Sequence, residues 1–253
     1  MDSKINFFIQ VRMGSTRFPE KVLRKFSSGK NTLDIMISTL KRSKFFSGDN
    51  IIVLTSMNSK DDILEFYCEQ NNLTCFRGDE NNVLQRFFDA SQKYHSEYIV
   101  RICGDNPFLQ CSLLDTLLGV AAKELGTDYY SFQKADETPA ILTHYGFFSE
   151  VIKTSAIEKA VTFTDDPVDL EHVTRVFYLN RDAFKCHFTP MPEIIDQSNI
   201  RLTFDTPEDF KVIDHILSEF ADDDVPYEKL IPYLNKNEQL LEQMKRNIQE
   251  NSK

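Results

Sequence analysis

The sequence predicts an α/β fold, in which helices flank a mostly parallel central sheet in a Rossmann-like arrangement. Over residues 1–125, short apolar runs typical of buried strands alternate four times with amphipathic helical segments. The 253 residues are 41% hydrophobic and 27% charged, which is typical of a globular chain with a large core. Polar loops follow several of the strands, where ligands bind in this class of sheet.

The elements of the first half follow from hydrophobic spacing and helix-start signals. In the segment 59–72, for example, Ser59 is a candidate N-cap, and Ile63, Phe66 and Tyr67 share one side. We expect strands over 5–11, 50–56, 73–76 and 97–103, and helices over 31–43, 59–72, 79–94 and 112–125.

The second half is less regular. We expect strands over 128–133, 183–190 and 200–204, and helices over 154–163, 169–180 and 206–220, with a weak helical pattern over 235–253. The clearest helix start has Thr206 as N-cap and Pro207 at the first position. We interpret the chain as one domain, 1–253, in which 127–195 is an insertion for acceptor binding or dimerisation.

Composition excludes several classes of protein. The chain has 29 Lys and Arg against 39 Asp and Glu, and a net charge of −10 argues against a general nucleic-acid binder. Its five cysteines form no CxxC pair, so a disulfide framework is not expected. No run of 18 apolar residues is present, which predicts no membrane insertion and a cytoplasmic protein.

The loop after the first predicted strand, "QVRMGSTRFPEKVL", concentrates cations on an acidic protein. Arg12, Arg17 and Lys21 surround Gly14 and Ser15. A strand that enters a glycine-containing turn exposes backbone N–H groups that can hold phosphates. The loop lacks both GxxxxGK[ST] and GxGxxG. Phosphate binding and a solvated basic loop are both consistent with these residues.

Two acids follow predicted buried strands, Asp105 in "RICGDNPF" and Asp205 in "RLTFDTPEDF". Each could cap its own turn or the following helix. Because the carboxyl ends of parallel strands meet at one edge, the pair could instead bind Mg²⁺, which takes one or two carboxylates together with substrate phosphates.

Two further stretches have both a structural and a functional interpretation. In "FRGDENNVLQRF", residues 79–81 suit a helix N-terminus, but the loop could also contact a base edge or ribose. In "DLEHVTRVF", His172 could be a buried structural histidine or, beside Glu171, a contact to a second substrate.

Five stretches together, "IQVRMGSTRFPEKVL", "FRGDENNVLQRF", "VRICGDNPF", "EHVT" and "IRLTFDTPEDF", resemble the cytidylyltransferase family. That family includes the spore-coat polysaccharide type and, more distantly, the keto-deoxy-octulosonate and sialic acid cytidylyltransferases. The resemblance implies a nucleotide-diphospho-sugar transferase fold. It also implies Mg²⁺-dependent transfer of CMP from CTP to a sugar acid or phosphorylated acceptor, with release of pyrophosphate.

The resemblance also implies residue roles. It places Arg12 and Lys21 on the triphosphate, Asp105 and Asp205 on the metal, and Glu150, Glu171 and His172 on the acceptor side. The wider nucleotide site would comprise Gln10, Arg12, Gly14, Ser15, Lys21, Arg77, Asn81 and Arg86. The chain departs from the family pattern at Glu20, where glycine is usual, and at Phe148, where an acid is usual.

Two other functions fit some of these features. A nucleotide-sugar-dependent glycosyltransferase usually carries an Asp-x-Asp motif, and residues 222–224 have that spacing, although they follow a helix in an acidic loop. A non-catalytic nucleotide-binding homologue would be consistent with the change at Phe148. A homodimer that associates through 127–195 is a further expectation.

Overall fold

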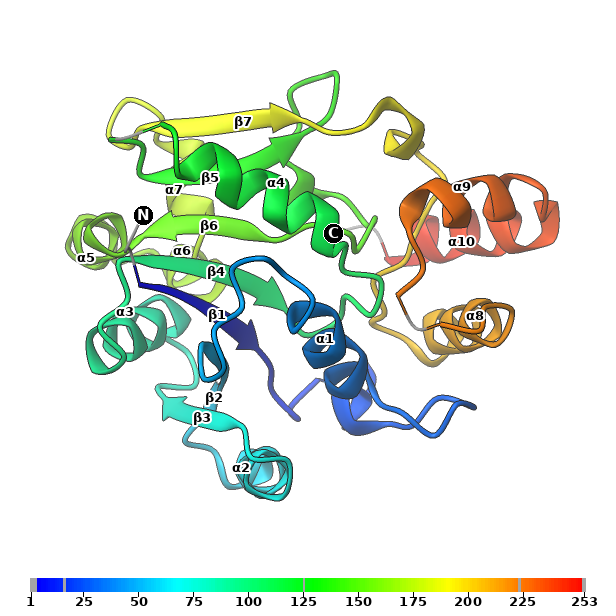
Figure 1. Ribbon diagram of the computed structural model, residues 1–253, viewed down its shortest axis with the longest axis horizontal. Coiled ribbons are helices and arrows are strands. Elements are labelled where there is room, and N and C mark those ends of the chain that lie inside the picture. The colour runs from blue at the N-terminus through cyan, green and yellow to red at the C-terminus, as the bar shows by residue number, and fades with distance from the viewer. Residues whose placement is uncertain (1–3, 16, 125, 223, 252–253) are drawn as a thin grey trace.

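The computed structural model describes residues 4–15, 17–124, 126–222 and 224–251. Within these ranges a seven-stranded sheet, in the order β3-β2-β1-β4-β6-β5-β7, forms the centre of the protein (Figure 1). Its strands are β1 (Ile5–Gln10), β2 (Ile51–Ser56), β3 (Thr74–Gly78), β4 (Tyr98–Cys103), β5 (Tyr129–Gln133), β6 (Glu150–Lys153) and β7 (Cys186–Pro190). Neighbouring strands are parallel except where β6 pairs with β4 and β5. The predicted α/β fold with a mostly parallel sheet is confirmed.

Helices follow most of the strands. They are α1 (Thr32–Leu40), α2 (Asp62–Gln70), α3 (Val83–Lys93), α4 (Cys111–Ala121), α5 (Thr154–Phe163), α6 (Pro167–His172), α7 (Arg175–Leu179), α8 (Pro207–Ser218), α9 (Tyr227–Asn235) and α10 (Glu238–Asn251). Short 3-10 turns are η1 (Lys21–Leu23), η2 (Ser59–Asp61), η3 (Ala140–Leu142) and η4 (Glu193–Ile195). Thr206 caps α8 as predicted, and its side chain accepts from the Asp209 amide. The predicted cap at Ser59 is wrong, because Asn58 accepts from Lys60 N at the start of η2.

The predicted strand over 200–204 is also wrong. This segment is irregular, and its backbone bonds go to loops: Leu202 N and Thr203 N donate to His144 O, and Phe204 N donates to Asp105 O. Because its neighbours are loops rather than a strand, its alternating apolar residues pack into the core, but its backbone forms no strand ladder. The four-residue strand β6 was not predicted; it lies between β4 and β5.

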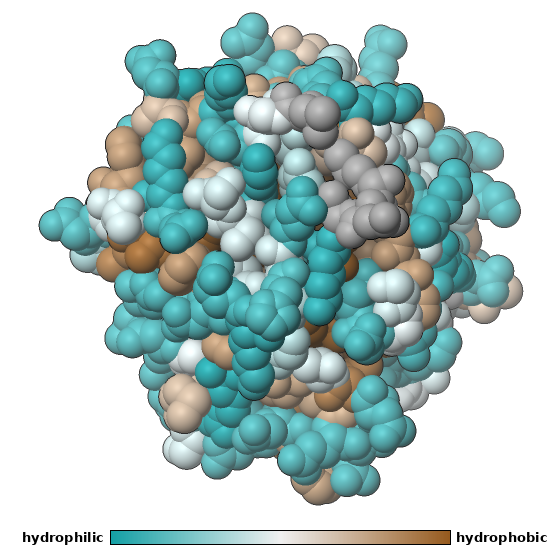
Figure 2. Space-filling model, turned by 60° about the vertical axis from the view of Figure 1, so that its left-hand side comes forward, coloured by the Kyte–Doolittle hydropathy of each residue, from teal (hydrophilic) through white to brown (hydrophobic). Residues whose placement is uncertain are grey.

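The sheet separates two hydrophobic cores, because successive strand residues face opposite sides. Phe7 and Ile9 of β1 pack on the side of α1 and α4, which lie in front of the sheet in Figure 1. Phe8 packs on the other side, where α3, α5 and α7 supply the core. Hydrophilic residues cover most of the face in Figure 2, and hydrophobic residues there form separate areas. No helix in the described ranges is long and apolar enough to cross a membrane.

The fold brings the loops that follow β1 and β4 to one edge of the sheet. β1 and β4 are adjacent and parallel, so the loops after Gln10 and Cys103 leave the sheet side by side. Helices α8, α9 and α10 gather at this same end, toward which the arrowheads of β1 and β4 point (Figure 1). Any ligand held by both loops therefore also lies near the segment that precedes α8.

Candidate active site

A cavity of about 770 Å³ opens at the carboxyl ends of β1 and β4, within the size range of small-molecule sites. Its walls come from the loop between β1 and η1 (the opening loop), the loop after β4, residues 140–150, helices α6 and α7, and the segment before α8. Most of the predicted site residues line it, namely Gln10, Arg12, Gly14, Ser15, Lys21, Arg86, Asp105, Glu150, Glu171, His172 and Asp205. Arg77 and Asn81 are not among its lining residues.

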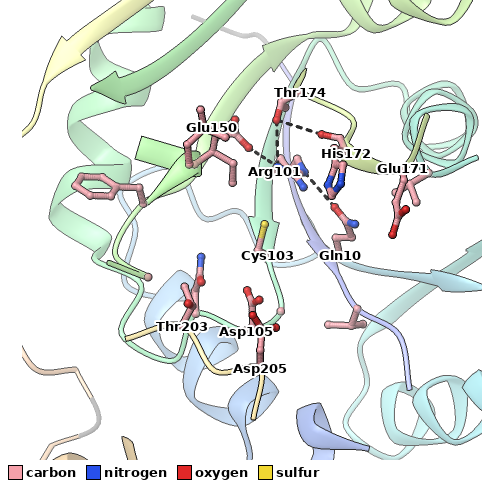
Figure 3. A pocket seen from close by; sticks show the side chains of 18 of the residues that line it. Gln10, Arg101, Cys103, Asp105, Glu150, Glu171, His172, Thr174, Thr203 and Asp205 are labelled. Carbon is pink, nitrogen blue, oxygen red and sulfur yellow. Dashed lines mark hydrogen bonds and ion pairs between the residues drawn. The ribbon is translucent and has the colours of Figure 1, made fainter. Parts of the chain in front are cut away.

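The two strand-end acids converge on one lysine at one end of the cavity. Lys21 Nζ lies 2.9 Å from Asp205 Oδ1 and 3.8 Å from Asp105 Oδ2. It also donates to Phe204 O at 2.8 Å. Figure 3 shows Asp105 and Asp205 next to each other, below Cys103. The sequence separation of these acids is large, and the fold alone brings them together.

Backbone contacts fix the two acids relative to each other. Phe204 N donates to Asp105 O at 3.3 Å, so the loop after β4 and the segment before α8 are joined directly. Burial opposes the charge of Asp205, but Lys21, Arg17 and Arg201 outweigh it and hold the pKa of Asp205 below its ordinary value. Asp205 is therefore an anion at neutral pH.

This arrangement fits a hard divalent cation. Two carboxylates already share one cationic partner, and Mg²⁺ commonly takes one or two protein carboxylates with water and phosphate oxygens as its other ligands. Within the described ranges no group of three or more His, Cys, Asp or Glu side chains is arranged to hold a metal. A metal here would therefore depend on substrate phosphates to complete its coordination.

Asp61, which was not among the residues predicted for the site, anchors the opening loop by accepting from its backbone. This carboxylate is 1% exposed and accepts from Ser56 Oγ at 2.5 Å, Met13 N at 2.8 Å, Thr55 Oγ1 at 2.8 Å and Ser56 N at 3.0 Å. Burial raises the pKa of Asp61, but these hydrogen bonds outweigh it and leave the pKa below its ordinary value. The position of Asp61 among charged neighbours in the sequence gave no signal that it is buried.

Glu20 adopts the left-handed conformation, with φ 59° and ψ 12°, immediately before η1. A non-glycine residue there carries strain of about 1–2 kcal/mol relative to glycine, because Cβ approaches the carbonyl oxygen. The turn directs Lys21 toward the acids, so the loop keeps this bend although it lacks the glycine usual in the family pattern.

The remaining opening-loop cations point to different partners. Arg12 pairs with Glu171 at 3.2 Å across the cavity mouth, and both side chains are about half exposed. Arg17 pairs with Asp205 at 3.1 Å. The partner carboxylates are exposed or already shared, so an incoming polyanion could replace them at low cost.

The "FRGDENNVLQRF" stretch contains one predicted site residue at the cavity, Arg86, and two away from it, Arg77 and Asn81. Arg86, 1% exposed, lines the cavity and donates to Asp79 O and Glu80 O. Burial lowers the pKa of Arg86 from its ordinary value. Arg77 instead bonds to Ser56 O and pairs with acids of α2, which keeps its guanidinium at the β3 edge.

The other end of the cavity contains a buried ion pair. Arg101 Nη1 lies 2.5 Å from Glu150 Oε2, and Arg101 Nε donates to Gln10 Oε1 at 3.0 Å (Figure 3). Tyr129 also donates to Glu150. Both oxygens of the Glu150 carboxylate thus have partners within the protein, and the ion pair links the adjacent strands β4 and β6 at this end of the cavity.

Residues 146–148 and helix α6 complete this end. Gly146 has φ +68°, and a Cβ there would come within 3.0 Å of the Leu202 backbone. Phe148 lines the cavity and packs against Phe132 with ring centroids 5.1 Å apart. Glu171 and His172 lie at the end of α6 on the opposite wall (Figure 3).

In the acidic run 222–224, the two described residues, Asp222 and Asp224, lie apart from the cavity. Asp222 is exposed, Asp224 pairs with Arg42 at 3.3 Å, and Asp223 lies outside the described residues. Neither Asp222 nor Asp224 lines the cavity, so the Asp-x-Asp spacing does not mark this site.

Comparisons with known proteins agree with the fold and with the motifs. A sequence profile of the family described as Cytidylyltransferase matches residues 7–250. The spore coat polysaccharide biosynthesis protein SpsF of Bacillus subtilis is 34% identical over 238 residues, which are 92% of this chain and 95% of that protein. An uncharacterised protein of Methanocaldococcus jannaschii is 36% identical over 237 residues, which are 94% and 93% of the two chains.

Solved structures give the same result. A cytidylyltransferase from Leptospira borgpetersenii superposes with a TM-score of 0.84 at 30% identity, over 94% of this chain and 97% of that one. A CMP:2-keto-3-deoxy-manno-octonic acid synthetase complexed with CTP gives a TM-score of 0.65 at 11% identity, over 86% and 99%, a likeness of fold. The profile match over nearly the whole chain, with which the 30% identical cytidylyltransferase structure agrees, shows that this chain belongs to the cytidylyltransferase family.

Proposed function

We propose that the protein transfers CMP from CTP to an oxygen of a small acceptor and releases pyrophosphate, in the biosynthesis of a surface polysaccharide or other glycan. The observation that carries this proposal is the convergence of Lys21, Asp105 and Asp205 beside the cationic opening loop, at one end of a cavity with room for a second substrate. The spore coat polysaccharide protein and the structure complexed with CTP support the choice of pathway and nucleotide.

The opening loop would bind the triphosphate. Arg12, Arg17 and Lys21 carry positive charge at the cavity wall, and backbone amides near Gly14 add donors. These cations would stabilise the pyrophosphate as it leaves. Since catalysis at phosphorus relies mainly on position and electrostatics, a pre-formed cationic loop supplies much of what the reaction needs.

Asp105 and Asp205 would hold Mg²⁺, which when bound neutralises charge that develops on the phosphates. Lys21 would then bond to phosphate oxygens in place of the carboxylate that it now contacts. The buried pair of Arg101 and Glu150 would hold the far wall in place, and Glu171 and His172, which line the cavity from α6, would contact the acceptor.

Direct transfer without a covalent enzyme intermediate fits the chemistry of the cavity. Cys103, which lies above the two acids in Figure 3, lines the cavity and is half-buried, and desolvation raises its pKa to about 11. A thiol with that pKa is overwhelmingly protonated at neutral pH and is a poor nucleophile. The acceptor oxygen itself is therefore the expected nucleophile, attacking the α-phosphate in line.

A pyrophosphate-release screen tests the proposal. Purified protein with Mg²⁺ would be offered each of four nucleoside triphosphates against sugar acids, sugar phosphates and phosphonates. We expect release only with CTP and one acceptor class. Nucleotide binding without release for every acceptor would favour a non-catalytic homologue. Transfer of a sugar to the same acceptors from a nucleotide sugar, offered in a parallel reaction, would favour a glycosyltransferase. Dimerisation through 127–195 stays a prediction.

A further inference from the structure

Asp205 is held in place by a buried carboxylate four residues farther along the chain. Asp209 is 2% exposed, and its Oδ2 accepts from Asp205 N at 3.0 Å and from Thr206 N at 3.1 Å. Arg201 donates to both of its oxygens, from Nε at 2.8 Å and Nη2 at 2.8 Å. Asp209 thereby holds the backbone N–H groups of both Asp205 and Thr206, which lie on either side of the Asp205 side chain.

One further donor reaches Asp209 from a distant helix. Asn247 of α10 donates from Nδ2 to Asp209 Oδ1 at 2.9 Å. Asn247 is 6% exposed, and α10 buries few of its residues, Met244 and Asn247 being the two that its packing covers fully. A buried amide costs free energy unless it is hydrogen-bonded, so an apolar residue would be the simpler way to pack this helix.

Helix α10 also reaches the cavity itself. Asn251, one turn beyond Asn247, lines the cavity and donates from Nδ2 to Asn247 O at 3.0 Å. Helix α10 thus supplies both the donor to Asp209 and a residue of the cavity wall. Both features place α10 beside the segment that carries Asp205.

We propose that Asn247 is a positioning residue for Asp205 and acts through Asp209, so that docking of α10 sets the geometry of the acid pair. This inference rests on the proposed function insofar as Asp205 is a metal ligand. Without Asn247, Oδ1 of Asp209 would accept a hydrogen bond from Arg201 alone. The carboxylate could then rotate away from the amides of Asp205 and Thr206.

The test compares two asparagine variants in protein without nucleotide or metal, and then in turnover. Asn247→Leu removes the donor and keeps the branching and the number of side-chain heavy atoms. Asn237→Ala is the matched control, because Asn237 donates a similar bond to Tyr233 O, away from Asp209. Amide hydrogen exchange is measured at Asp205, at Thr206 and along α10, and kcat and KM for CTP are measured in the screen described above.

For Asn247→Leu we expect exchange at Asp205 and Thr206 to be about tenfold faster, the equilibrium effect of losing one hydrogen bond to a charged group. Exchange along α10 should stay as in the wild type, kcat should fall about tenfold and KM for CTP should change less than about twofold. Asn237→Ala should leave the exchange of both amides and kcat unchanged.

Two outcomes would overturn the inference. One is unchanged exchange at Asp205 and Thr206 in Asn247→Leu. The other is equally fast exchange in Asn237→Ala or throughout α10, which would mean that the helix merely loosens. Failure of the proposed function is separate: full turnover by an Asp205→Asn variant would refute the metal role, whereas the exchange data decide the link to Asn247 without any substrate.

Discussion

The substitution Asp205→Asn removes one charge from the acid pair and keeps the size of the side chain. Asp205 contacts Lys21 at 2.9 Å, Arg17 at 3.1 Å and Arg201 at 3.5 Å. Its backbone N–H bond to Asp209 does not involve the side chain and stays intact. The variant should therefore fold, with its defect confined to the charge at the site.

The size of the effect follows from these distances. Two unit charges about 3 Å apart attract by roughly 5–6 kcal/mol at an effective dielectric constant of about 20. Removing one fixed electrostatic contact in an active site usually costs about 2.7–4 kcal/mol of transition-state stabilisation. Asn keeps one oxygen as an acceptor for Lys21, so we expect the lower end, a fall in kcat of about 100-fold.

The assay is pyrophosphate release from CTP with the acceptor found by the screen, across a titration of Mg²⁺. Asp214→Asn is the matched control, on the helix α8 that follows Asp205: Asp214 accepts from Ser27 N and Oγ at 2.7 and 2.6 Å and does not line the cavity. Its turnover should stay within about twofold of wild type, as for an ordinary surface site. Near-normal turnover by folded Asp205→Asn at every Mg²⁺ concentration would refute the role of Asp205.

Three further predictions concern the support of the site. Asp61→Asn should lower the free energy of unfolding by about 2 kcal/mol at pH 7. Because the folded pKa of Asp61 lies below the ordinary value of 3.8, this stabilisation is complete above about pH 4 and is lost as the pH falls through the folded pKa. Urea unfolding at pH 7 and pH 3 checks this, and an equal difference at both would contradict it. Arg101→Met should cost about 3–5 kcal/mol by leaving Glu150 buried and unpaired, and the double variant with Glu150→Gln should be less unstable in the same measurement. Arg12→Ala should hardly change Tm, since its pair with Glu171 is exposed, but should raise KM for CTP about tenfold; an unchanged KM would remove Arg12 from the triphosphate site.

Local patterns predicted the parts of the fold that local chemistry determines. The strands before Arg12 and Asp105 are short apolar runs, and parallel strands deliver the loops after them to one edge, so those residues could be placed together in advance. Thr206 could be identified as a cap because Pro207 and two acids follow it. These signals lie within a few residues of the feature that they specify.

The rest depends on contacts that the sequence pattern does not encode. Arg101 faces Glu150 because of the antiparallel register of β4 with β6, a strand too short to be recognised by its alternation. Asp61 and Asn247 lie in polar stretches typical of solvated helix surfaces, yet both are buried by elements distant in sequence. Residues 200–204 alternate like a strand, but the structure surrounds them with loops.

The hydrogen bond from Phe204 N to Asp105 O joins segments that are separated by about 100 positions in the chain. Closing so long a loop is entropically costly, and contacts of this kind form late when a chain folds. The strand–helix units that present Arg12 and Asp105 can assemble from nearby contacts, whereas we expect Asp205 to reach the site after the segments of 129–200 have packed. During refolding, we therefore expect native-like secondary structure to precede turnover, so that activity reports completion of the tertiary structure.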